Sequence, residues 1–175
     1  MSTSIKEKII KKLGVIVGEE FRYVFRAGNM LTLGFGNDID YERKNIAKEI
    51  VARYALHIQT SWRMISGDRI ILGVDDFYIS QNGVTYQEFE ENCGYGKSMF
   101  DLNSARVNEY LSKMRINVLR IEGNDHGDLT IYFENGYLLE VFVSNSSYDE
   151  SWRFFEIGKE QAHFIRFDEC RNLVE

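Results

Sequence analysis

Leu31-Thr32-Leu33-Gly34-Phe35 occurs in near copy later in the chain, as Leu129-Thr130-Ile131-Tyr132-Phe133. The same triplet follows each copy, Ser61-Trp62-Arg63 after the first and Ser151-Trp152-Arg153 after the second. The only two tryptophans of the chain therefore occupy equivalent places. Landmarks that recur in one order indicate an internal duplication, which predicts a pseudo-symmetric, β-rich fold.

A third landmark precedes each copy, because Val24-Phe25-Arg26 is echoed by Val118-Leu119-Arg120. We therefore expect two antiparallel β repeats, residues 19–78 and 115–168, joined by a hairpin, a polar loop and a helix in residues 79–114. A chain of 175 residues suits one ordinary domain with a single core. The expected fold is one α+β domain, mainly antiparallel sheet, with two or three helices.

Helical signals lie between the predicted strands. Ser4 and Glu7 form a capping-box pattern, which predicts a helix over residues 4–13. Asp101 can cap a second helix over residues 101–114, whose apolar residues recur on one face. A looser helical pattern over residues 37–50 predicts an insertion in the first repeat.

Alternation of apolar and polar residues predicts the strands. The clearest runs without a break from Tyr54 to Met64. Asn82-Gly83 predicts a hairpin between residues 77–79 and 84–86, and Asn135-Gly136 predicts a type I′ turn. The other expected strands cover residues 21–26, 31–35, 70–74, 116–121, 128–134, 137–143, 151–156 and 162–167.

Composition narrows the class of protein. A hydrophobic fraction of 44% indicates a globular chain, and a net charge of −6 disfavours binding to a phosphate backbone. No apolar run approaches the roughly 20 residues that span a bilayer, and the apolar run near the N-terminus is too short for a signal peptide. Cys93 and Cys170 stand far apart without metal-ligand spacing. We expect a cytoplasmic protein without membrane contact, metal or cofactor.

Catalytic motifs are incomplete. Gly94-Tyr95-Gly96-Lys97-Ser98 matches the end of a phosphate-binding loop, but Glu91 stands where that loop needs its first glycine. The three histidines, His57, His126 and His163, show no metal-ligand spacing. We therefore expect a binding protein more than an enzyme.

Acidic residues with aromatic neighbours form the candidate partner-binding surface. Carboxylates steer a basic protein toward such a surface, and aromatic rings supply contact area. The other interpretation is a solvated loop whose charges keep a sheet edge soluble. The candidate residues are Asp75, Asp76, Glu88, Glu90, Glu91 and Tyr95.

The tryptophans and arginines of the two triplets have different expected roles. Trp62 continues an apolar face and should pack in the core, where its indole N–H needs a partner. Arg63 and Arg153 should point away from the core. They can stack on aromatic rings, pair with acidic side chains on adjacent strands, or form one anion site.

The second repeat resembles a group of small bacterial proteins of uncharacterised function. The resemblance is carried by Leu129-Thr130-Ile131-Tyr132-Phe133, by Leu139-Glu140-Val141-Phe142 and by Glu150-Ser151-Trp152. Some small bacterial proteins of this general kind are immunity proteins that neutralise toxins. The resemblance therefore implies a non-enzymatic protein-binding module with a basic bacterial protein as its partner, and it implies no catalytic residue.

Two alternatives come from other classes. An enzyme or ligand-binding protein could assemble its site between the repeats, in a deep polar pocket with at least two ionisable side chains. A homo-oligomeric scaffold would instead expose an apolar patch on one repeat.

Overall fold

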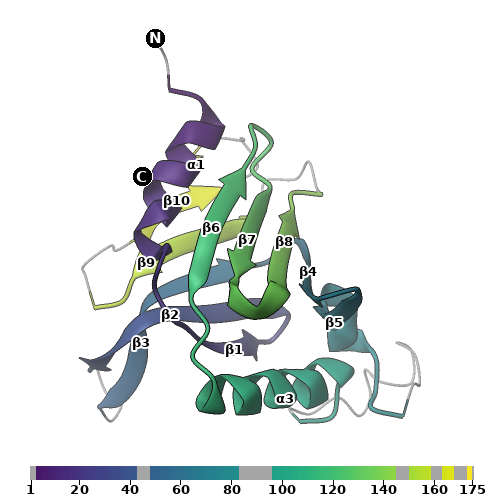
Figure 1. The fold of residues 1–175 in the computed structure, drawn as a ribbon. Helices are drawn as coiled ribbons and strands as arrows, with labels where there is room; N and C mark the ends of the chain where they lie inside the picture. The colour runs from purple at the N-terminus through teal and green to yellow at the C-terminus, as the bar shows by residue number, and fades with distance from the viewer. Residues whose placement is uncertain are drawn as a thin grey trace.

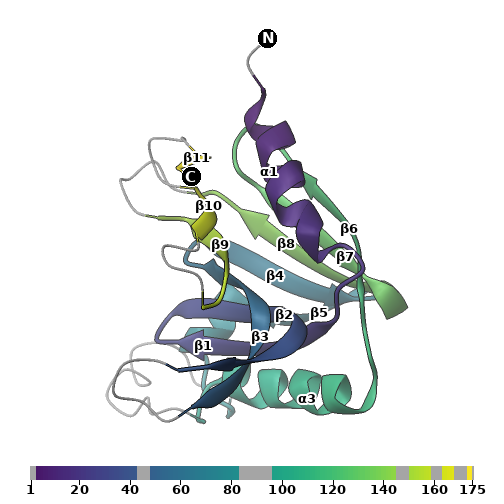
Figure 2. The same ribbon diagram turned by 90° about the vertical axis from the view of Figure 1, so that its left-hand side faces the viewer.

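The computed structural model describes residues 3–42, 48–82, 96–144 and 150–158, and the backbone of residues 163–167 and 173–174. These residues form an α+β fold of two antiparallel sheets with two α-helices (Figure 1). The strands of one sheet cross those of the other steeply, and α1 and α3 lie at opposite ends of the molecule (Figures 1 and 2). The α+β class predicted from the sequence is confirmed.

Each of the two described α-helices begins at a capping box. In α1 (Ile5–Leu13), the Ser4 hydroxyl accepts from the Glu7 backbone N–H at 3.2 Å, as predicted. The second helix, α3 (Met99–Lys113), is capped by Ser98, and Asp101 is the reciprocal partner in its first turn. The prediction of Asp101 as the cap itself is therefore wrong by three residues. Short 3₁₀ turns occupy η1 (Gly14–Ile16), η2 (Val74–Tyr78) and η3 (Glu134–Gly136).

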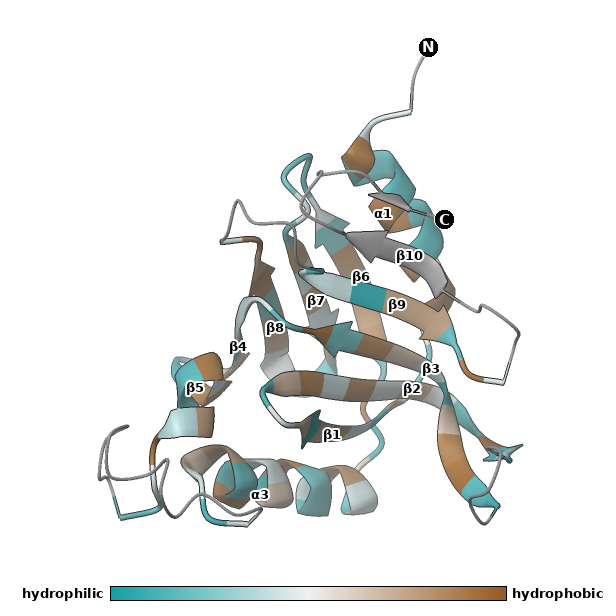
Figure 3. Ribbon diagram, turned by 180° about the vertical axis from the view of Figure 1, so that it is seen from behind, coloured by the Kyte–Doolittle hydropathy of each residue, from teal (hydrophilic) through white to brown (hydrophobic). Residues whose placement is uncertain are grey.

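The described strands form a six-stranded and a five-stranded sheet. The first sheet has the order β1-β2-β3-β9-β10-β11, and the second has the order β5-β4-β8-β7-β6. Hydrophobic residues occur along both β2 and β3 (Figure 3), and among them Leu31, Leu33, Phe35, Leu56 and Ile58 are fully buried. The strand bounds are β1 (Phe21–Ala27), β2 (Met30–Tyr41), β3 (Glu49–Ile58), β4 (Ser61–Ser66), β5 (Arg69–Gly73), β6 (Val118–Gly123), β7 (Leu129–Phe133), β8 (Tyr137–Phe142), β9 (Trp152–Glu156), β10 (His163–Phe167) and β11 (Leu173–Val174).

The two halves of the chain exchange strands. Three consecutive strands of each half, β1-β2-β3 and β6-β7-β8, form a meander in one sheet. The next two strands of each half cross to the other sheet, so that β4 pairs with β8 and β9 pairs with β3. The order β1-β2-β3-β9-β10 therefore corresponds to β6-β7-β8-β4-β5, and β11 has no counterpart among the described strands. That a duplication produced this correspondence stays a prediction.

The helices also cross between halves. The helix α1 precedes β1 but contacts β6, whereas α3 precedes β6 but contacts β1. The linkers that follow the helices pair with each other, since Phe21 N–H donates to the Ile116 carbonyl and Val118 N–H donates to the Glu19 carbonyl. These two bonds lie at corresponding positions, so the junction between the halves is itself a short antiparallel pair.

The strand pairing changes one of the matches made between the two halves of the sequence. Phe21 lies opposite Phe35, and Val118 lies opposite Phe133. Position 118 therefore corresponds to position 21, and the match of Val118 to Val24 was wrong by three residues. Each strand has a register irregularity directly after this position, which supports the new correspondence.

The expected helical insertion over residues 37–50 is wrong for the described part of that range. Strand β2 continues to Tyr41, and Asp38 through Tyr41 pair with Ala52 through Glu49 in β3. The pairing with β3 shifts register between Phe35 and Asp38, where Gly36 has a positive φ of 81°, and β2 continues beyond this irregularity as a strand.

The predicted strand from Tyr54 to Met64 is two strands. The chain leaves the first sheet after β3 and enters the second at β4, and Thr60 Oγ1 at this corner donates to the Phe142 carbonyl at 2.7 Å. The predicted strand over residues 77–79 is also wrong, because the 3₁₀ turn η2 covers residues 74–78. The predicted partner strand, residues 84–86, lies outside the described residues. The Asn135-Gly136 turn is confirmed, with φ of 59° and 75°.

Candidate functional site

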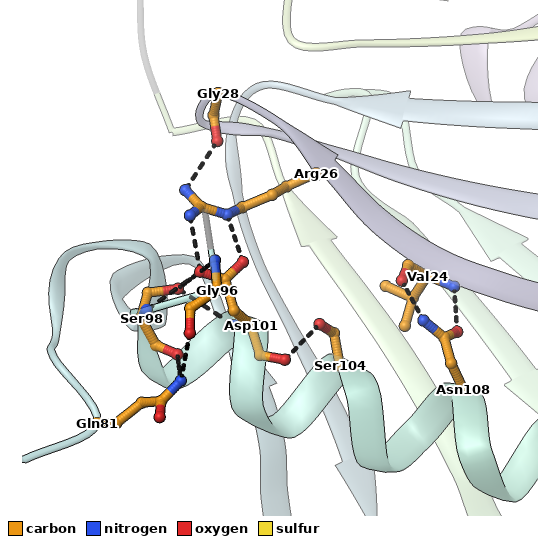
Figure 4. Close-up of polar contacts among 9 residues, drawn as sticks. All are labelled: Val24, Arg26, Gly28, Gln81, Gly96, Ser98, Asp101, Ser104 and Asn108. Carbon is orange, nitrogen blue, oxygen red and sulfur yellow. Dashed lines mark hydrogen bonds and ion pairs between the residues drawn. The ribbon is translucent and has the colours of Figure 1, made fainter. Parts of the chain in front are cut away.

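The helix α3 is held on strand β1 by a largely buried ion pair (Figure 4). Arg26 Nε and Nη2 each donate to the Asp101 carboxylate at 2.8 Å, and both side chains are nearly buried. Burial alone raises the pKa of Asp101, but hydrogen bonds from Arg26 and Ser98 outweigh it and lower the pKa below its usual value. Asp101 therefore stays ionised and fixes where α3 begins.

The same carboxylate accepts hydrogen bonds from the segment that matches the end of a phosphate-binding motif. The backbone N–H groups of Gly96 and Ser98 both donate to Asp101 Oδ2, at 3.1 Å (Figure 4). These donors at a helix N-terminus would suit an anion. Here the anion is a side chain of the chain itself, and the rest of the motif, Gly94 and Tyr95, lies outside the described residues.

A second contact holds the middle of α3. The Asn108 side chain accepts from Val24 N–H at 2.9 Å and donates to the Val24 carbonyl at 2.8 Å (Figure 4). Strand β1 is at the edge of its sheet, so Asn108 satisfies backbone groups that a neighbouring strand would otherwise bind. Asp101 and Asn108 thus hold the start and the middle of α3 on β1, and another face of the helix lines a groove.

We call this groove the α3 groove, and it has a volume of about 370 Å³. One wall is a row across three strands, because Ser66 in β4 lies opposite both Arg69 in β5 and Tyr137 in β8. The other wall is one face of α3, at helical spacing. The lining residues are Ser66, Arg69, Ile70, Ile71, Asn103, Arg106, Val107, Tyr110 and Tyr137.

The α3 groove combines apolar surface with a few polar groups. Ile70 is 61% exposed, and the rings of Tyr110 and Tyr137 lie 5.8 Å apart between centroids. Burial raises the pKa of the Tyr137 phenol, so this hydroxyl is a neutral hydrogen-bonding group at physiological pH. Arg69 and Arg106 add positive charge, and no carboxylate of the described residues lines the groove. Such a surface suits binding more than acid–base chemistry.

The residues predicted from the sequence for the acidic surface are only partly described. Asp75 is exposed in η2, whereas Asp76 turns inward and its Oδ2 accepts from Gly73 N–H at 2.9 Å. Burial raises the pKa of Asp76, and the bond from Gly73 partly offsets this effect. Asp76 thus caps a turn as well as adding charge. The other four residues, Glu88, Glu90, Glu91 and Tyr95, lie outside the described residues.

The two arginines of the repeated triplets lie in different sheets and pair with facing neighbours. Arg63 forms an ion pair with Glu140 directly across the strand pair. Arg153 lies opposite His57, and Arg153 Nε is 3.3 Å from His57 Nδ1. Arg153 Nη1 also lies 3.4 Å from the Glu150 carboxylate. Pairing with side chains on adjacent strands was one of the predicted roles, and a shared anion site is not formed.

Both tryptophans lie in the core, as expected. Trp152 is fully buried, and its indole N–H donates to the Gly127 carbonyl at 2.8 Å. Trp62 is 3% exposed, and its N–H has no hydrogen-bond partner among the described residues. The two copies of the triplet therefore differ in how they satisfy the same polar group.

Aromatic rings fill the junction between the halves, which was the expected place of a small-molecule site. Phe133 packs against Phe21 at 4.8 Å between ring centroids and against Phe35 at 6.4 Å. A polar cavity of about 460 Å³ lies beside the junction, lined by Glu20 and basic residues of β1 and the end of α3. Its Glu20 carboxylate is bound by Arg22 at 3.0 Å and by Arg115 at 3.6 Å, so it is neutralised within the fold.

Within the described part of the chain, no group of three or more His, Cys, Asp or Glu side chains could hold a metal ion. None of the described helices has the length and apolar character needed to cross a membrane. Comparison with protein families, with curated proteins and with solved structures found no match for this chain.

Sequence reasoning missed the α3 groove. Its residues come from the end of β4, from β5, from α3 and from the start of β8, and no linear motif joins them. The helical spacing of Arg106 and Tyr110 was visible, but the exposure of Ile70 in a predicted strand was not. Only the crossing of β4 and β5 into the second sheet brings these segments together.

Proposed function

We propose that this chain is a non-enzymatic protein-binding module whose contact surface is the α3 groove. The observation that carries the proposal is the composition of this groove. Tyrosine and arginine dominate the energetic centres of protein interfaces, and an exposed isoleucine beside them supplies apolar area. Ile70, 61% exposed next to Tyr110, Tyr137, Arg69 and Arg106, provides this combination.

The chemistry of the groove supports binding over catalysis. Its ionisable side chains among the described residues are two arginines and two tyrosines. Ser66 lines the groove, but the described lining offers no His, Lys or carboxylate beside it to act as a base, and no pair of carboxylates.

The more specific form of the proposal is an immunity protein that neutralises a basic bacterial toxin. Its support is the net charge of −6 and the resemblance of the second repeat to small bacterial proteins. The net negative charge raises the rate of association with a basic partner, and the side chains of the groove make the specific contacts. The acidic candidate residues, Asp75 among them, then steer the basic partner toward the chain.

The test is capture of a partner from a lysate of the source organism, followed by titration calorimetry with the purified partner. We expect I70D to weaken binding at least tenfold, because a carboxylate would replace exposed apolar surface in the groove. The matched control is I50D, since Ile50 is 73% exposed on β3. Equal affinities for I70D and I50D would remove the groove from the proposal, and capture of no protein would remove protein binding altogether.

The toxin-neutralising form has its own test. Expression of the captured partner alone should stop bacterial growth, and co-expression with this chain should restore it. Reversal of Glu88, Glu90 and Glu91 to lysine should weaken binding and reduce its dependence on salt. Unchanged affinity in this triple variant would exclude the acidic surface from the interface.

A further inference from the structure

The arginines whose side chains are described divide into two groups by their ion pairing. The structure describes nine arginine side chains, and seven of them lie within 3.6 Å of a carboxylate oxygen. The seven are Arg22, Arg26, Arg53, Arg63, Arg115, Arg120 and Arg153. The remaining two, Arg69 and Arg106, both line the α3 groove.

These two guanidinium groups are weakly engaged within the described residues. Arg106 Nη1 donates only to the neutral Asn103 amide oxygen, at 3.3 Å. Arg69 lies 4.0 Å from Asp68, and both of these side chains are almost fully exposed, so solvent screens the pair. In a chain with six more acidic than basic groups, both described arginines without a close carboxylate lie at one groove, whereas the exposed Lys8 and Lys11 lie apart from it on α1.

The size and shape of the groove limit what can enter. Its α3 wall runs from Asn103 to Tyr110, about 10 Å at the usual helical rise. An extended chain advances about 3.3 Å per residue, so two or three residues fit along this wall. The Tyr110–Tyr137 pair offers ring surface at one end, and Ile70 offers aliphatic surface.

We infer that the α3 groove receives an acidic segment of the protein partner, with a carboxylate between Arg69 and Arg106 and an apolar or aromatic neighbour against Ile70 and the tyrosine pair. Charge complementarity carries this inference, because arginine binds carboxylates through paired N–H donors. The inference rests on the proposed function and names the partner segment that the same site selects. A partner that is basic overall then presents a local acidic segment here.

The direct test uses three blocked hexapeptides that share a central leucine-tyrosine and carry glutamate, glutamine or lysine on both sides of it. Binding is followed by NMR shifts of the Arg106, Tyr110 and Tyr137 side chains. We expect the glutamate peptide to bind at least fivefold more tightly than the glutamine peptide, and the lysine peptide to cause no shift. Equal binding of the three peptides would overturn the inference.

Matched variants separate the groove from general electrostatics. The variant R69Q/R106Q should lose the preference for the glutamate peptide. The variant K8Q/K11Q removes the same charge from the exposed side of α1 and should keep that preference. Equal loss in both variants would reduce the effect to net charge and overturn the inference.

Two further outcomes would assign the groove to a different occupant. Tighter binding of free 4-hydroxyphenylacetate than of the glutamate peptide would show that the groove takes a small organic anion instead of a protein segment. A captured partner that is weakened by I70D but not by R69Q/R106Q would keep the proposed function and overturn the acidic segment. Each failure is therefore distinguishable from the failure of protein binding itself.

Discussion

Phe35 and Phe133 stack with nearly parallel rings, 6.4 Å apart between centroids and inclined by 4°. Each is the last residue of the repeated five-residue stretch, and the two belong to different sheets. Phe35 lies opposite Phe21 in the first sheet, and Phe133 lies opposite Val118 in the second. Both are buried. The repeated stretch thus places matching rings against each other at the junction between the halves.

Truncation of either ring should destabilise the whole fold. We expect F133A to lower the free energy of unfolding by about 3–5 kcal/mol, since it removes a buried ring that contacts both Phe21 and Phe35. Urea unfolding followed by circular dichroism measures this change. Phe25 is 54% exposed on β1, so F25A is the control and should cost far less. Similar losses in F133A and F25A would contradict a central role for the stack.

The tryptophans predict a difference between the two copies of the triplet. W152F removes the donor to the Gly127 carbonyl and leaves that buried oxygen unpaired, whereas W62F removes an N–H that has no partner among the described residues. The free energy of unfolding should therefore fall by about 1–3 kcal/mol more in W152F than in W62F. Both variants shrink the side chain equally, so each controls for the lost volume of the other. Equal losses would show that the indole hydrogen bond is not stabilising.

Local signals in the sequence predicted more than long-range ones. The capping box of α1 was predictable because Ser4 and Glu7 bind each other's backbone within one turn. The corner between β3 and β4 was not, since the alternation of buried residues continues through it at Ile58, Thr60 and Trp62. Period-two burial reports which side of the chain is buried and does not report which sheet the strand joins.

The candidate site likewise depends on long-range contacts that local signals in the sequence do not report. The composition predicted a binding protein with an acidic surface, but the α3 groove depends on which strands of one half enter the sheet of the other. The chemical selectivity of the groove depends on ion pairs across strands and helices, which leave Arg69 and Arg106 without a close carboxylate among the described residues. No spacing in the sequence reports those pairings.

The ion pair between Arg26 and Asp101 predicts a pH dependence of stability. Because the pKa of Asp101 is lowered in the folded state, its contribution is complete above the unfolded-state pKa of about 3.9 and is lost as the pH falls through the folded-state value. At pH 7, D101N should therefore lower the free energy of unfolding by about 1–3 kcal/mol. The gap to the wild type should narrow below pH 4. E109Q, which removes only an exposed pair with Lys113, should show no such gap, and a pH-independent gap in D101N would contradict the assignment.

The contact between Asn108 and Val24 predicts local opening of the edge of β1. N108A removes both hydrogen bonds to Val24, so the free energy of unfolding should fall by about 1–2 kcal/mol and α3 should hold β1 less firmly. Amide hydrogen exchange measures the local effect, and the Val24 N–H should lose protection. The control is N103A on the same helix, because Asn103 bonds only to the exposed Arg106 among the described residues. If the Val24 N–H stays protected in N108A to the same degree as in N103A, another group closes this edge and α3 depends on the Arg26–Asp101 pair alone.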